Sequence, residues 1–535
     1  MIKVRVPMMV DDARFAPLGR PEAIEGYDIT GEEWFGDGPA TERVAVVDRD
    51  LATGAVYPPA RFVPPRKGHV LGRYALQEPY QVDSRTFNQV STFATVMKTI
   101  RMFEESDALG RRVAWAFPQP QLTVLPRAGW GENAFYRRER GSLEFHYFSS
   151  RNDPSQIIYT SMARDIVAHE TAHAIIDGIA PRLWEAITPQ SLALHEAVAD
   201  LTALLVSIRS RVLRSAVLRR TGGSIEHSSN FSAIGEEFGV ARGSGALRDL
   251  KNDLRMSTAP RDPYRLSQVL TGALYSVFVK MHAQRTLVEA ARRGSSEYSA
   301  SGYGLWTAAE HLKRMTLRAL DYLPPGEVSF ADYGRAILAA DEVSHPDDPQ
   351  ERIWMVDEFV RREIVPGREA LEMPAAYLAR TAALLEGTSL NELLSNDPAA
   401  YTFVNSPVGR EVLSIPADVQ PVLEPRLMVA KDYYHRSPDG VVWPVTVREG
   451  LLKVWWTRWE EGGAPPAACP SRRIAVGTTL SWDWDSGRVR VLLTANRRDR
   501  PTELIEERAD RDVALSGIAG PQSPGDLPDN RGAGC

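Results

Sequence analysis

Apolar positions change their spacing along this chain, and the change divides it into regions. From residue 1 to about 80 they fall in short strand-like runs, such as 43–47, between prolines and glycines. A helical spacing follows at Phe87, Val90, Ala94, Met97 and Ile100. Three further strand-like runs cover 122–125, 133–136 and 143–148. We therefore predict a β-rich N-terminal lobe over 1–160 that contains one helix.

A helical pattern dominates the next region, 161–365. Two apolar helices are expected on either side of residue 181, followed by helices at 267–284, 305–320 and 330–340. The whole chain is therefore predicted to be an α+β protein. A ligand site is expected in the cleft between the β-rich lobe and the helical lobe, where binding clefts often lie.

Beyond Pro366 the pattern changes again, and we predict an accessory region over 366–516. Residues 370–400 look helical, whereas 420–500 look strand-like and hold half of the 12 tryptophans. These are Trp443, Trp455, Trp456, Trp459, Trp482 and Trp484. They indicate either an aromatic surface that binds glycans or protein, or a small β-domain with a tryptophan core, and the core interpretation is favoured. The tail, 517–535, is rich in Gly, Pro, Asp and Asn and is predicted to be disordered.

Composition narrows the function classes. The net charge of −6 gives no electrostatic case for nucleic-acid binding. Cys469 and Cys535 are the only cysteines, too few for a disulfide framework or a Cys-x-x-Cys metal site. No run approaches a membrane span, and the first 20 residues lack the apolar core of a signal peptide. The default expectation is a cytoplasmic protein without a membrane partner. Export without a cleaved signal and the oligomeric state stay open.

Candidate chemistry is concentrated in the two helices around residue 181. His169 and His173 are four residues apart, so a helix places both imidazoles on one face, where they can bind one metal ion. Glu170 lies beside them as a candidate general base, in an H-E-x-x-H pattern typical of zinc peptidases. On the second helix Glu196 is a candidate third ligand, and Asp200, one turn later, can hold the N–H of a ligand histidine. The alternatives are a core helix with hydrogen-bonded polar residues and a salt-bridged surface pair.

These two segments resemble the thermolysin-like gluzincin zinc metallopeptidases, in a divergent, unsecreted bacterial form. Residues 165–177 resemble the catalytic helix of that family, and 195–200 resemble the helix of its third ligand. The resemblance covers about 80–360. It implies a thermolysin-like catalytic unit, a Zn²⁺ cofactor and a peptide or protein substrate.

Weaker matches extend the resemblance to the substrate site. Asn133 and Ala134 begin a segment similar to the edge strand that pairs with the substrate backbone in the family. Arg255 lies in a segment that resembles the one whose arginine contacts the substrate carbonyl. Where the family has a tyrosine that stabilises the tetrahedral intermediate, this chain has Trp184. Where the family has a second such residue, a histidine, this chain has Tyr264, which is either an oxyanion donor or a packed tyrosine.

The family's calcium site is not clearly matched. Asp165 corresponds to one calcium ligand, but 207–220 carries five arginines where acidic ligands would be needed. These arginines are interpreted as a solvated helix face, with an anionic partner as the less favoured alternative. A structural calcium ion is not expected.

The sequence therefore predicts a zinc-dependent endopeptidase. His169, His173 and Glu196 are the expected zinc ligands, and Glu170 is the expected general base. Asp200, Arg255 and Tyr264 are expected to assist catalysis, and Asn133, Ala134 and Trp184 to contact the substrate. The alternative is a catalytically weak zinc protein that binds partners through its Trp-rich region. A self-cleaving toxin or effector is a third, less favoured interpretation.

Overall fold

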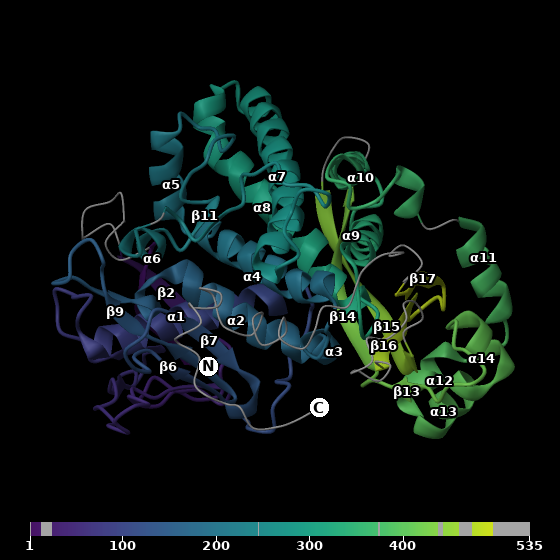
Figure 1. Cartoon of the computed structure of the whole chain (residues 1–535), viewed down its shortest axis with the longest axis horizontal. Helices are drawn as coiled ribbons and strands as arrows, with labels where there is room; N and C mark the ends of the chain where they lie inside the picture. Colours follow the sequence, from purple (N-terminus) through teal and green to yellow (C-terminus); the bar gives the residue numbers. More distant parts are fainter. Residues whose placement is uncertain are drawn as a thin grey trace, which may run out of the picture.

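The computed structural model describes residues 2–11, 24–243, 245–372, 375–436, 442–459 and 473–495. It is a mixed α+β protein, as the sequence predicts, with a strand-rich part at the N-terminal side, long helices in the middle and a second sheet near the C-terminus (Figure 1). The predicted tail at 517–535 lies outside the described residues.

The N-terminal lobe surrounds one long helix, α1 (Arg85–Glu104), which matches the predicted helix. Its strands are β1 (Lys3–Met9), β2 (Ile24–Ile29), β3 (Val44–Val46), β4 (Phe62–Val63), β5 (Leu71–Tyr74), β6 (Leu122–Leu125), β7 (Ala134–Arg137), β8 (Ser142–Phe145), β9 (Tyr147–Ser149) and β10 (Ile157–Tyr159). They form sheets in the orders β2-β1-β5-β4, β3-β6-β8-β7 and β10-β9. Strand β7 therefore lies at a sheet edge, paired antiparallel with β8.

The helical lobe follows the predicted order, although its helices are longer than expected. Its elements are α2 (Arg164–Ile179), α3 (Pro181–Trp184), α4 (Pro189–Ile208), α5 (Arg211–Arg220), β11 (Ala233–Ile234), α6 (Glu236–Ala241), β12 (Arg248–Asp249), α7 (Pro263–Arg293), α8 (Glu297–Tyr322), α9 (Phe330–Ser344) and α10 (Gln350–Arg361). Thr188 is the N-cap residue of α4 and Pro189 its first helical residue.

Gly178 does not end α2, contrary to what its type suggests. It lies inside the helix, and a Cβ there would meet the Ala114 carbonyl oxygen at 2.0 Å. The glycine is needed because the backbone at Ala114 approaches α2 this closely.

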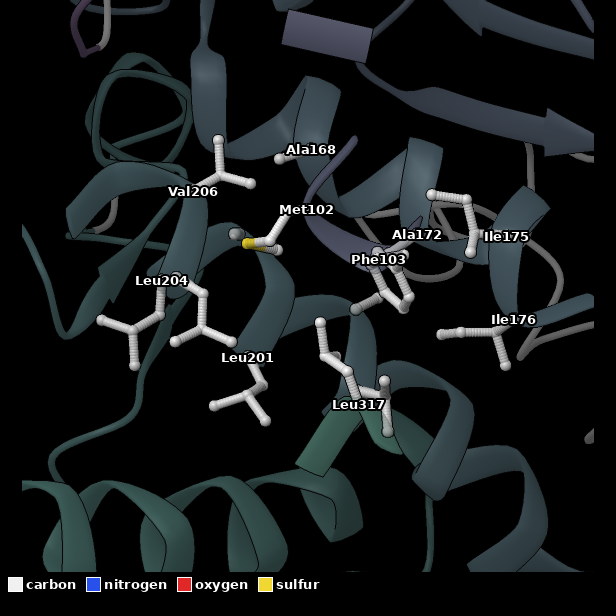
Figure 2. Close-up of a cluster of buried hydrophobic side chains, with 14 of the residues drawn as sticks. Met102, Phe103, Ala168, Ala172, Ile175, Ile176, Leu201, Leu204, Val206 and Leu317 are labelled. Atoms are coloured by element: carbon white, nitrogen blue, oxygen red, sulfur yellow. The ribbon is translucent and has the colours of Figure 1, made fainter. Parts of the chain in front are cut away.

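The main core lies between α1, α2, α4 and α8, as Figure 2 shows. Met102 and Phe103 of α1 lie in one cluster with Ala172 and Ile176 of α2, and Leu201 of α4 and other apolar side chains complete it. This packing fixes α2 and α4 against each other through their apolar faces. Their polar residues are then left to face one another on the remaining side.

The expectation that no run approaches a membrane span is wrong for α4, which is long and apolar enough to cross a membrane by length and composition. Its most apolar window is 100% buried inside the protein, however, as in a core helix.

The accessory region contains the predicted helices and strands. They are α11 (Ala375–Leu384), α12 (Leu390–Ser395), α13 (Asp397–Asn405), α14 (Pro407–Val412), β13 (Val422–Leu423), β14 (Leu427–Arg436), β15 (Val442–Trp459), β16 (Arg473–Asp483) and β17 (Val489–Thr494). Trp456 and Trp482 are buried in the core of this region, whereas Trp443 is 42% exposed. Trp455 is partly buried beneath the Arg182 guanidinium, and the side chain of Trp459 lies outside the described residues. Of the six tryptophans, Trp456 and Trp482 thus lie in a core, as the favoured interpretation predicted.

Buried ionic contacts join this sheet to the helical lobe. Lys431 of β14 binds Asp321 of α8 at 2.8 Å, and Tyr322 donates to Glu449 of β15 at 2.8 Å. Burial alone would raise the pKa of Asp321, but Arg111 and Lys431 outweigh it and lower that pKa. Because an isolated buried charge is costly, these pairs hold the sheet in one position on α8.

Asp165, the residue that resembles a calcium ligand of the family, binds backbone N–H groups through its carboxylate. Its two carboxylate oxygens accept the N–H groups of Ile166 at 2.7 Å and of Gly235 at 2.6 Å. Gly235 has φ +64°, a conformation that favours glycine, and it is the N-cap residue of α6. The carboxylate therefore has a structural role without a cation, and the expected absence of calcium stays a prediction.

Candidate metal centre

The predicted site residues on α2 and α4 face each other across the interface between the two helices. His169, Glu170 and Asp200 are fully buried, and His173 and Glu196 are 6% and 4% exposed. The apolar faces of both helices point into the main core (Figure 2), so these five polar side chains gather on the opposite side.

Three ligand atoms converge at this point. His169 Nε2 lies 3.0 Å from His173 Nε2, and Glu196 carboxylate oxygens lie 3.4 Å and 3.5 Å from these two nitrogens. For a tetrahedral zinc site with metal–ligand distances of about 2.0–2.1 Å, neighbouring ligands are expected about 3.3 Å apart. Glu170 also belongs to this group of potential ligands, within 4.8 Å of the histidine nitrogens. The spacing of His169, His173 and Glu196 fits a zinc ion.

The hydrogen-bond partners of the two imidazoles support the same conclusion. His169 Nδ1 lies 2.9 Å from Asp200 Oδ1, and His173 Nδ1 lies 2.7 Å from His195 Nδ1. When the Nδ1 atoms carry the protons, both Nε2 lone pairs point at each other and at the Glu196 carboxylate. Lone pairs and negative charge gathered in a buried space need a positive charge. Burial opposes it, but Asp200 and Glu196 raise the pKa of His169 to about 9, so without a metal a proton on this ring supplies that charge, and a metal ion could take its place.

Asp200 links the centre to Arg248, a residue that the sequence interpretation did not single out. Arg248 donates from Nε and Nη2 to the two Asp200 oxygens, each at 2.7 Å. Burial alone would raise the pKa of Asp200, but Arg248 and His169 outweigh it and lower this pKa to about 2. Asp200 therefore remains charged and holds the His169 ring, as a carboxylate behind a metal-binding histidine does.

His195 was also missed, although it directly precedes Glu196. Its ring stacks on His173 with centroids 4.8 Å apart, and its Nδ1 accepts the proton of His173 Nδ1 when His173 binds a metal. Burial lowers the pKa of His195 to about 3, and the charge of His169 adds to the effect, so the ring is neutral. His195 thus orients the second histidine as Asp200 orients the first.

Trp184 packs against the pair formed by His173 and His195. Its ring is 8% exposed and lies edge-on to His195 at 5.2 Å and to Tyr136 at 5.1 Å. The indole therefore fixes the position of His195 through packing. Its predicted contact with substrate stays a prediction.

Glu170 has the environment of a buried proton acceptor. Neither of its carboxylate oxygens has a hydrogen-bond partner of ordinary geometry among the described residues. Burial raises the pKa of Glu170 to about 8, against the opposing effect of His169. A bound cation would counteract this increase, because a positive charge favours the carboxylate. The side chain therefore suits proton transfer near neutral pH.

Strand β7, which follows Asn133 and begins at Ala134, lies at the edge of its sheet, as the family resemblance implies, and it packs against α2. Asn133 and Ala134 are 4% and 0% exposed, and the Asn133 side chain accepts the Ala134 N–H at 2.9 Å. Tyr136 of the same strand donates to Asp177 of α2 at 2.7 Å. The edge strand is thereby tied to the helix that carries the two histidines.

Tyr264 lies near the centre, but Arg255 does not. The Tyr264 ring is 8% exposed at the start of α7, with the Arg248 guanidinium 6.0 Å from its centroid. The side chain of Arg255 is half exposed and pairs with Glu363 at 3.7 Å, and none of its contacts reaches the histidines or their carboxylates. The arginine that the structure places at the centre is Arg248, beside Asp200. The sequence signal that could have indicated a buried Arg248 was its apolar neighbours, Leu247 and Leu250.

A second group of potential ligands, His311, Asp341 and His345, joins α8 to α9 and the segment after it. Arg285 donates to His311 Nδ1 at 2.6 Å, so the proton of His311 is on Nε2, directed at Asp341 Oδ1 2.8 Å away. Asp341 also accepts from Arg352 at 2.8 Å. His311 Nε2 therefore has no free lone pair for a metal, and Arg285 and Arg352 already bind the group. We interpret these residues as a hydrogen-bonded network rather than a metal site.

Comparison with known proteins adds no relative, since no family model matches the chain and no curated protein is significantly similar to it. The interpretation of the centre therefore depends on its own geometry.

One zinc ion per chain is expected, bound at the α2–α4 site. His173→Ala should lose it, whereas His345→Asn should retain it, because the carboxylate of the second group is already paired with His311 and Arg352. Metal analysis of protein purified without added metal tests both variants. A second stoichiometric zinc ion, or zinc loss only in His345→Asn, would contradict the assignment.

Arg248→Gln should weaken zinc binding by roughly 10- to 100-fold, because Asp200 would lose the partner that fixes it behind His169. The matched control is Arg255→Gln, the same substitution at an exposed position, which should leave zinc affinity unchanged. Competition with a chelating dye measures both affinities, and melting temperatures show whether each variant folds. Equal effects of the two substitutions would remove Arg248 from the centre.

Proposed function

We propose that this protein is a zinc-dependent endopeptidase of the thermolysin-like gluzincin type. The observation that supports this most strongly is the convergence of His169 Nε2, His173 Nε2 and Glu196 beside the buried carboxylate of Glu170. Three protein ligands leave a fourth position for water or substrate, which distinguishes catalytic zinc sites from structural ones.

A zinc ion bound by these residues would polarise a peptide carbonyl and lower the pKa of a water molecule toward ~7. Glu170 would accept the proton of the attacking water and then deliver it to the nitrogen of the leaving amine. The lack of competing hydrogen bonds to its carboxylate leaves both oxygens available for this transfer.

The surrounding residues would orient the reaction. Asp200, held by Arg248, and His195, packed under Trp184, would fix the two imidazoles. Strand β7 would pair with an extended peptide along its outer edge, where the Ala134 N–H now donates to the Asn133 side chain. The backbone N–H of Tyr136 in this strand faces Glu170, so such a peptide would lie beside the proton acceptor.

Glu170→Gln should retain zinc and lose nearly all peptidase activity, because an amide cannot accept the proton of water. Cleavage of a broad peptide library, measured with zinc content for the wild type and this variant, tests the role. A fully active Glu170→Gln protein would exclude Glu170 as the base. If the wild type is as inactive as the variant, the alternative of a zinc-containing binding protein is favoured.

Tyr264→Phe should lower kcat by roughly 10²-fold if the phenol donates to the oxyanion, the effect expected for losing one preorganised donor. Zinc content and KM should change little, because the ring and its packing beside Arg248 are retained. Steady-state kinetics on a cleaved peptide measure the effect. An unchanged kcat would show that Tyr264 is a packing residue.

A further inference from the structure

A cationic hollow of about 630 Å³ lies between α5, α8 and the end of α7. We call it the arginine hollow. Figure 1 shows these helices side by side. Its lining residues are Arg209, Arg211, Arg214, Ser215, Arg293, Gly302, Tyr303 and Trp306. Four guanidinium groups and two aromatic rings thus line one recess, and no lining residue carries a carboxylate.

The positive charge of the hollow is only partly neutralised. Arg209 pairs with Glu105 at 2.6 Å and Glu310 at 3.0 Å, which hold it from behind. Arg214 donates to the Ile208 carbonyl at 2.6 Å, and neither Arg214 nor Arg211 has a carboxylate partner among the described residues. Burial lowers the pKa of Arg214. The charges of Glu25 and Glu310 oppose this effect, and that of Arg211 adds to it. Two guanidinium groups without a carboxylate in direct contact among the described residues thus face one recess in a chain of net charge −6.

The aromatic rings give the hollow a flat, partly apolar wall. Trp306 has the guanidinium of Arg214 at 5.0 Å and that of Arg209 at 5.8 Å from its ring centroid. Tyr303 is 48% exposed, with Arg293 at 5.2 Å. Guanidinium groups bind phosphate oxygens in pairs, and aromatic and guanidinium planes both stack on planar rings. The volume lies in the range of sites for small molecules.

From these features we infer that the arginine hollow binds a phosphorylated small molecule with a planar ring, of the class of nucleoside phosphates. Arg211 and Arg214 would bind the phosphate oxygens, and Trp306 with Tyr303 would contact the ring. A plain anion would leave the aromatic wall unused. An acidic peptide would engage the arginines without needing a ring-sized recess.

This site is separate from the zinc centre. Arg209 follows the last turn of α4, on the order of 20 Å along the helix axis from Glu196 at about 1.5 Å per residue. Binding would therefore require neither zinc nor Glu170, and it goes beyond the proposed peptidase function.

The test is calorimetric titration of the full-length, zinc-containing protein with ADP, inorganic diphosphate, adenosine and a hexaglutamate peptide. ADP should bind more tightly than the other three, and equally well to Glu170→Gln. Arg211→Gln/Arg214→Gln should bind ADP at least tenfold more weakly, since two charge-assisted contacts are lost. Trp306→Leu should weaken ADP binding more than diphosphate binding.

The matched control is Arg219→Gln/Arg220→Gln, which makes the same charge change on α5 outside the hollow and should leave ADP binding unchanged. Zinc content and melting temperature show that each variant folds. The inference is overturned if ADP does not bind, or if both double variants weaken it equally. It is also overturned if diphosphate binds as tightly as ADP, which would indicate a simple anion patch. Tighter binding of hexaglutamate would indicate an acidic protein partner instead.

Discussion

The contact between the polar faces of α2 and α4 is the constraint on which the rest of this structure depends. Three imidazoles and three carboxylates are buried there, and removing such groups from water is costly unless each finds a partner. Asp200 finds Arg248 and His169, and His173 finds His195. The Nε2 atoms and Glu196 are left facing each other, in an arrangement that could hold a metal ion.

The need for partners explains why distant segments are held so firmly around this contact. Arg248 belongs to the short strand β12 and binds Asp200. Tyr136 and Arg138, at the sheet edge beside α2, bind Asp177. Each of these residues joins a different segment to the two helices. Because losing one member of a buried ionic pair leaves the other uncompensated, the segments are stabilised together.

Similar buried networks recur away from the centre and have a different role. The contact of Lys431 with Asp321 joins β14 to α8, and Asp341 joins His311 to Arg352. In both networks the acidic oxygens accept from several cations or N–H groups, which already neutralise their charge. A group of histidines and carboxylates is therefore a metal site only when its lone pairs converge without donors between them.

The sequence by itself determined the local part of this protein. Helical spacing placed His169, Glu170 and His173 on one face and Glu196 with Asp200 on another, and period-two runs placed β6 and β7. Only the tertiary structure decided which distant residues joined them. Arg248, His195 and the stacking of Trp184 depend on contacts between segments, and Arg255 was misplaced because residue type and approximate position do not determine a side-chain contact. The five arginines after α4 looked like one solvated face, but packing against α8 turned some of them into a recess. Local periodicity is encoded by neighbouring residues, whereas partners across the fold depend on how whole elements pack.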